Sequence, residues 1–128
     1  MTYYFSKTLE TSFDEAVSRA TEALKREGFG VLTAIDVQEA LRRKLGVDFR
    51  RYRILGACNP GMAYQALQAE DKIGTMLPCN VIVQETGTGT VEVSAVDPVA
   101  SMQAIDNPKL RAVAETVREQ LRRVVETL

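Results

Sequence analysis

Apolar residues recur at every third or fourth position in four stretches of this chain, the spacing that gives a helix one apolar side. Each stretch begins at a residue that caps helices well: Ser12, Asp36, Asn59 or Asn107. After Asn59 and Asn107 comes a proline, which suits the first helical turn because no N–H is needed there. We predict helices over residues 12–28, 36–46, 59–67 and 107–128.

The second and third helices are expected to bury one side against the rest of the domain. These sides are formed by Val37, Ala40, Leu41 and Leu45 in the second helix, and by Met62, Ala63, Ala66 and Leu67 in the third.

Five other segments are rich in β-branched and aromatic residues or alternate in polarity, and we predict them to be strands. They cover residues 2–9, 29–35, 49–58, 79–85 and 91–96. The loop 86–90 is short enough for a hairpin, which favours an antiparallel sheet. Residues 99–106 are expected to be irregular. The predicted fold is a single α+β domain over residues 1–128, with two layers: a mainly antiparallel sheet and helices on one of its faces.

The composition narrows the range of partners. The 128 residues carry a net charge of −1 and a pI near 5.5, so no overall positive field attracts nucleic acid or an anionic membrane surface. No apolar run approaches the length of a membrane span, and the first residues do not resemble a secretory signal. We expect a cytoplasmic protein with no nucleic-acid and no membrane partner.

The chain contains no histidine. This excludes Ser–His and Cys–His nucleophile pairs, imidazole metal sites and a histidine general base. Any catalysis would have to use Cys, Asp, Glu, Lys, Arg or Tyr, and the residues indicate no particular cofactor. Whether the domain is an enzyme stays open.

Two Cys-Asn pairs are the main candidates for chemistry. Cys58-Asn59 ends the third predicted strand and Cys79-Asn80 begins the fourth. If these strands are antiparallel neighbours, both pairs lie at one edge of the sheet. Two thiols there could bind a soft metal, form a disulfide or flank a small ligand. The alternative, which we favour, is that both cysteines are small buried apolar residues. No metal site is predicted, because a closed zinc site would need two more ligands.

Asp36 and Asp97 are candidate acid–base groups or cation ligands, although we favour the alternative that Asp36 caps a helix and Asp97 ends a strand before a proline. A dense basic cluster could bind phosphates, but ion pairs on a solvated edge are the favoured interpretation. The cluster contains Arg42, Arg43, Lys44, Arg50, Arg51 and Arg53.

Three segments also carry a resemblance: GFGVLTAIDVQEALRRKLGVDF from Gly28, YRILGACNP from Tyr52, and LPCNVIV from Leu77. Together with the later VDP they closely resemble the family called Domain of Unknown Function three-hundred-and-two. The resemblance implies a curved antiparallel sheet similar to the TATA-binding-protein-like class, and a homodimer. It implies no catalytic role for the motif positions, which are Gly28, Gly30, Asp36, Gly56, Cys58, Asn59, Pro60, Leu77, Pro78, Cys79 and Asn80.

Three functions therefore remain for testing. The leading hypothesis is a small-ligand or metal-binding domain whose site is lined by Cys58, Asn59, Cys79 and Asn80, with Asp36 and Asp97 as further candidates. The alternatives are a thiol-dependent redox enzyme and a structural interaction module that acts as a homodimer.

Overall fold

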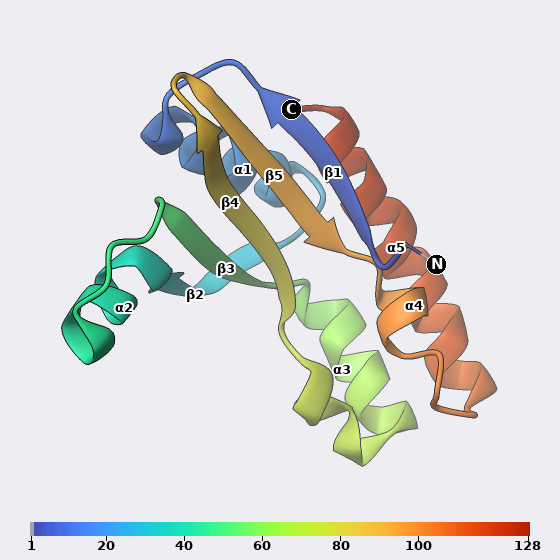
Figure 1. Ribbon diagram of the computed structural model, residues 1–128. Coiled ribbons are helices and arrows are strands. Elements are labelled where there is room, and N and C mark those ends of the chain that lie inside the picture. The colour runs from blue at the N-terminus through green and yellow to red at the C-terminus, as the bar shows by residue number, and fades with distance from the viewer. Residues whose placement is uncertain (1) are drawn as a thin grey trace.

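The computed structural model describes residues 2–128 as a five-stranded antiparallel sheet with helices packed against it, which confirms the predicted α+β class (Figure 1). The strand order is β1-β5-β4-β3-β2, so β1 and β2 are the two edges. The strands are β1 (Tyr4–Leu9), β2 (Gly30–Asp36), β3 (Tyr52–Cys58), β4 (Cys79–Gly87) and β5 (Thr90–Val96).

Every predicted helix is present, and each begins at the capping residue that the sequence indicated. The side chains of Ser12, Asp36, Asn59 and Asn107 all accept hydrogen bonds from backbone N–H groups of the first turn. The helical elements are α1 (Phe13–Arg26), α2 (Val37–Leu45), α3 (Pro60–Ala69), the 3₁₀ helix η1 (Asp71–Met76), α4 (Pro98–Ser101) and α5 (Pro108–Glu126).

The apolar residues form two clusters. The larger lies between α1, α5 and the inner face of β3, β4 and β5, where Leu24, Val83, Val93 and Leu121 are fully buried. In Figure 1 both long helices lie behind the sheet, so that face is covered. The smaller cluster joins α3, η1, α4 and the first half of α5 around Ile73. Within residues 2–128, no helix combines the length and apolarity needed to cross a membrane.

One expectation about a buried helix side is wrong, and a second, for α3, is wrong only for Leu67. Helix α2 buries none of its residues, and Leu45 is 68% exposed, because α2 projects from the sheet beyond the ends of β2 and β3 (Figure 1). In α3 only Ala66 is buried, while Leu67 is 44% exposed. The segment expected to be irregular contains the short helix α4, which Asp97 caps through two backbone N–H groups.

Candidate functional site

The two cysteines lie together, as predicted, at the edge of the sheet where β3 ends and β4 begins. This edge, here called the Cys-Asn edge, is formed by strand ends and is distinct from the edge strands β1 and β2. Strands β3 and β4 are antiparallel neighbours, and Ala57 pairs directly with Cys79, so Cys58 is one residue further along the same edge. Both cysteines are free; Cys79 is buried and Cys58 is half-buried. The register of the two strands therefore brings together thiols that are 20 residues apart in sequence.

Cys79 is the more deeply buried thiol of the pair. Burial raises the pKa of its thiol to about 11, and the neighbouring Cys58 adds to the rise. A thiol with this pKa is protonated at neutral pH, and a protonated thiol is a poor nucleophile and a poor metal ligand.

Asn59 connects three elements at this edge. Its Oδ1 accepts a hydrogen bond from the Met62 N–H at 3.4 Å, which caps α3, and its Nδ2 donates to Gln120 Oε1 at 3.4 Å, on α5. Gly28, after α1, lies directly against it: a Cβ on Gly28 would be 3.3 Å from Asn59 Nδ2. The φ of Gly28 is +87°, a value that also favours glycine. These contacts account for Gly28 and Asn59 within the motif segments.

A cavity of about 290 Å³, here called the main cavity, opens beside Cys58, Asn59 and Cys79. It lies where the two apolar clusters meet, between α3, α5 and the ends of β3 and β4. Asn59 is the only amide side chain in its lining, and no charged residue lines it. The other lining residues are Phe29, Leu32, Ala57, Met62, Ala63, Ala66, Leu67, Leu77, Pro78, Pro98, Met102, Leu110, Val113, Ala114 and Val117.

Small side chains leave this space unfilled. Ala63 and Ala66 on α3 and Ala114 on α5 all line the cavity, and alanine at these positions fills less volume than a larger apolar side chain would. Leu32 and Leu67, both exposed, lie at the mouth. Since protein interiors are normally packed without voids of this size, an apolar cavity that opens to solvent has the character of a binding site.

Asn80 does not share this cavity. It follows Cys79 in β4 and therefore points to the opposite face of the sheet, where it is exposed. There it lines a second cavity of about 250 Å³, here called the sheet-side cavity, with Met76, Pro78, Cys79, Val96, Ser101 and Met102. The two Cys-Asn pairs thus lie at one edge, and Cys79 lines both cavities, but Asn59 and Asn80 line different ones.

The two candidate aspartates are separated by the length of the sheet. Asp97 follows β5 at the same end as Cys79, but it is buried and bound to protein groups: it caps α4 and lies 3.3 Å from Arg118 Nε. Asp36 is at the far end of β2, six residues beyond the Gly30–Cys58 pair, which corresponds to about 20 Å. Neither lines the main cavity.

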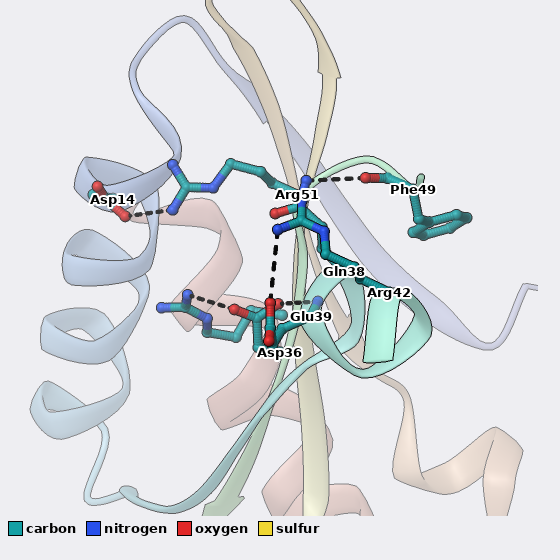
Figure 2. Close-up of polar contacts among 8 residues, drawn as sticks. Asp14, Asp36, Gln38, Glu39, Arg42, Phe49 and Arg51 are labelled. Atoms are coloured by element: carbon teal, nitrogen blue, oxygen red, sulfur yellow. Dashed lines mark hydrogen bonds and ion pairs between the residues drawn. The ribbon is translucent and has the colours of Figure 1, made fainter. Parts of the chain in front are cut away.

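Figure 2 shows Asp36 within a polar network at that far end. Its carboxylate caps α2 through the Glu39 N–H and forms an ion pair with Arg53 at 3.6 Å. Arg51 in turn lies 2.9 Å from Asp14 on α1. Arg42 and Arg43 form ion pairs with Glu39, whereas Arg50 donates to Gln84. Ion pairing, the favoured interpretation of the basic cluster, holds for Arg42, Arg43, Arg51 and Arg53, whereas Arg50 instead bonds to a neutral amide.

The arrangement suits binding better than acid–base or metal chemistry. Among residues 2–128, no group of three or more His, Cys, Asp or Glu side chains is placed to hold a metal ion. The lining of the main cavity consists of apolar side chains, the amide of Asn59, which caps α3, and the thiols of Cys58 and Cys79. These groups can exclude water and orient a ligand, but none of them is an ionised acid or base aimed into the cavity.

Most of the cavity wall was not identified from the sequence. These residues lie more than 20 positions after Cys79: Met102 follows α4, and Leu110, Val113, Ala114 and Val117 belong to α5. One signal was present: the small residues Ala63, Ala66 and Ala114 occur on helix sides that were expected to be buried. Alanine at such positions allows either close helix packing or a cavity, and the sequence does not distinguish between them.

Comparison with known proteins supports a family assignment. Residues 5–128 match the sequence model of the family described as "Domain of unknown function DUF302". A crystal structure titled "uncharacterized conserved protein DUF302 from Bacillus stearothermophilus" is 30% identical, with a TM-score of 0.90 over 98% of each chain. None of the curated proteins matches the sequence. The resemblance found in the three motif segments is thereby confirmed, and this chain belongs to the DUF302 family.

Proposed function

We propose that this domain binds a small, predominantly apolar ligand in the main cavity, and that it does so without catalysing a reaction. The observation that carries the proposal is the uncharged lining of the cavity, in which Asn59 and the two cysteines are the main polar groups. A ligand that fills this space gains free energy by removing apolar surface from water. The lining disfavours charged groups inside, because burying an unpaired charge is costly.

The thiols are expected to flank the ligand rather than to react. A redox function needs a thiolate to start exchange, and the pKa of Cys79, about 11, opposes thiolate formation. Cys79 also has an ordinary structural role, since it packs in the larger apolar cluster with Ala57 and Val81. Metal binding has even less support, because the cavity wall contains no histidine or carboxylate, and one of its two thiols, Cys79, is protonated at neutral pH.

Nile red, a neutral apolar dye, can report occupancy of the cavity by its rise in fluorescence. Ala63 lines the cavity and is half-buried, so Ala63→Phe should fill part of it. Ala112 on α5 is exposed and lines no part of the cavity, which makes Ala112→Phe a matched control. We expect Nile red to bind the unmodified protein and the control equally, and Ala63→Phe to weaken binding about tenfold or more.

Thermal unfolding of both variants shows whether they are folded. Equal dye binding by Ala63→Phe and the control, with both folded, would contradict the proposal, as would the absence of saturable binding by the unmodified protein. Native mass spectrometry of the purified protein adds a direct readout, since a retained ligand appears as extra mass that is lost on denaturation.

A second function, homodimer formation, is favoured by a separate observation. The edge strand β2 and helix α2 carry a group of exposed apolar residues, here called the β2–α2 surface: Leu32, Ile35, Leu45 and Val47, which are 43–68% exposed. An edge strand offers unpaired backbone groups, and an apolar surface of this kind is typical of a protein contact. We propose that a second copy of this chain covers it.

Sedimentation equilibrium tests this proposal. Leu45→Lys adds a charge at a position that is 68% exposed, so it should leave the fold intact and convert the dimer to a monomer. Met76, an exposed methionine outside the β2–α2 surface, provides the control substitution Met76→Lys, which should remain dimeric. A monomeric unmodified protein at micromolar concentration, or a dimeric Leu45→Lys variant, would overturn the proposal.

A further inference from the structure

Met102 stands at the junction of every cavity described so far and of a third one. It lines the main cavity and the sheet-side cavity, and it also lines a space of about 110 Å³ between α4 and α5. The third space, here called the Arg111 cavity, is formed by Val99, Met102, Gln103, Ile105, Leu110, Arg111 and Ala114.

The wall between the main cavity and the Arg111 cavity contains one flexible side chain. Leu110, Ala114 and Met102 line both spaces. Leu110 and Ala114 are buried on one side of α5 and are held by the helix. Met102 follows the short helix α4 and has three rotatable side-chain bonds, so it is the side chain of this wall with the most freedom to change rotamer while the backbone stays in place.

The two neighbouring spaces differ in charge. The main cavity has no charged lining residue, whereas the lining of the Arg111 cavity includes Arg111 and Gln103, both of which are exposed. None of the seven residues of the Arg111 cavity is acidic, and Arg111 forms no ion pair with the residues in 2–128. Arg111 is also in the first turns of α5, where the helix dipole favours a negative charge.

We propose that the ligand is a linear amphiphile with a carboxylate head, of the fatty-acid type. The inference rests on the proposed function. The carboxylate pairs with Arg111 and Gln103 in the Arg111 cavity, and the hydrocarbon chain passes Met102 into the main cavity. A linear chain fits this arrangement because it can follow two spaces that meet at one side chain, and an arginine binds a carboxylate through two parallel N–H donors.

Displacement of bound Nile red tests the head group and the chain separately. The probes are decanoate, decanol and decylamine, each below its micelle concentration, together with cyclohexane-ring compounds of similar size. We expect decanoate to bind about five- to tenfold more tightly than decanol, and decylamine to bind more weakly than either.

Two pairs of variants test whether Arg111 causes the preference for decanoate and whether the chain passes Met102. Arg111→Gln should bring decanoate to the affinity of decanol, whereas Lys109→Gln, an exposed neighbour on α5 that lines none of the cavities, should leave the difference unchanged. Met102→Phe should block the junction and abolish displacement by decanoate, while Met102→Leu, of similar volume, should retain it. Arg111 is exposed, so its variant is expected to fold even if a Met102 variant does not.

The outcomes separate this proposal from the one it rests on. Equal affinities of decanoate and decanol, or no effect of Arg111→Gln, would overturn the carboxylate assignment. Tighter binding of the ring compounds than of the decyl chains would overturn the linear ligand while the main cavity remains a binding site. If Nile red binding itself did not depend on Ala63, the proposed function would fail and this inference with it.

Discussion

The hydroxyl of Thr33 occupies the space in which a side chain on Gly56 would lie. These two residues pair across β2 and β3, and a Cβ added to Gly56 would overlap Thr33 Oγ1 and come within 2.8 Å of Pro78 Cγ. Because Gly56 has no side chain, β2, β3 and the residues that lead into β4 can lie close together, directly beside the Cys-Asn edge.

We expect Gly56→Ala to destabilise the domain. The added methyl group has no free space, because one neighbour is in the paired strand and the other is a proline ring, and overpacking of this kind costs about 1–3 kcal/mol. Gly30 in β2 is the matched control: a Cβ there meets nothing within 4 Å, so Gly30→Ala should change stability by about 1 kcal/mol or less. Urea denaturation of the two variants measures the difference, and equal midpoints would refute the crowding at Gly56.

Asp97 and Asp36 both cap helices, yet they should differ in their contribution to stability. Asp97 is 6% exposed, accepts hydrogen bonds from the Val99 and Ala100 N–H groups and faces Arg118, an ion pair without hydrogen-bond geometry. We expect Asp97→Ala to cost roughly 2–3 kcal/mol, since it removes the cap and leaves a guanidinium partly buried without its partner. Asp36→Ala should cost roughly 1 kcal/mol, the usual value for an exposed cap.

The same urea experiment measures both aspartate variants. A loss of stability for Asp36→Ala that equals or exceeds the loss for Asp97→Ala would show that burial does not govern the contribution of these caps.

Stability should fall at alkaline pH because of Cys79. Burial raises the pKa of this thiol in the folded chain from 9.0 to about 11, so between these values the unfolded chain loses the proton while the folded chain retains it. The contribution of Cys79 is thus fully present below pH 9 and is lost as the pH rises towards 11; the total is on the order of 2–3 kcal/mol.

Free energies of unfolding at several pH values between 8 and 11 test this dependence. Tyrosines and lysines also titrate in this range, so the informative quantity is the difference between the unmodified protein and Cys79→Ala. Cys58→Ala serves as the control, and it should retain most of the pH dependence, because burial is the main cause of the raised pKa of Cys79 and Cys58 a smaller one. Parallel curves for the unmodified protein and Cys79→Ala would contradict the raised pKa.

Thiol reagents should distinguish the two cysteines. Cys58 is half-buried at the mouth of a cavity and Cys79 is 8% exposed, so 5,5′-dithiobis(2-nitrobenzoate) should modify Cys58 first. At pH 8 the raised pKa alone should slow the reaction of Cys79 about a hundredfold relative to the denatured chain. Stopped-flow absorbance on Cys58→Ser isolates Cys79, and a native rate equal to the denatured rate would overturn this expectation.

The elements and their ends were determined by local chemistry. Helix starts at Ser12, Asp36, Asn59 and Asn107 could be predicted because a cap satisfies backbone groups within three residues. The edge position of Cys58 and Cys79 followed from one assumption, that consecutive strands pair, and the register confirmed it. Asp36 shows the limit of reasoning from motif segments. It was grouped with the cysteines as a candidate site residue, but it lies at the opposite end of the paired strands β2 and β3.

The sequence by itself thus determined the α+β class, the family, the capped helices and the edge at which the thiols meet. Only the tertiary structure decided which apolar residues are buried, that Asn59 and Asn80 face different cavities, and that Met102 lies between three spaces. The physical reason is that a cap or a strand alternation depends on neighbours in the chain. A cavity depends on the volume left between α3, α4 and α5, which no single segment specifies.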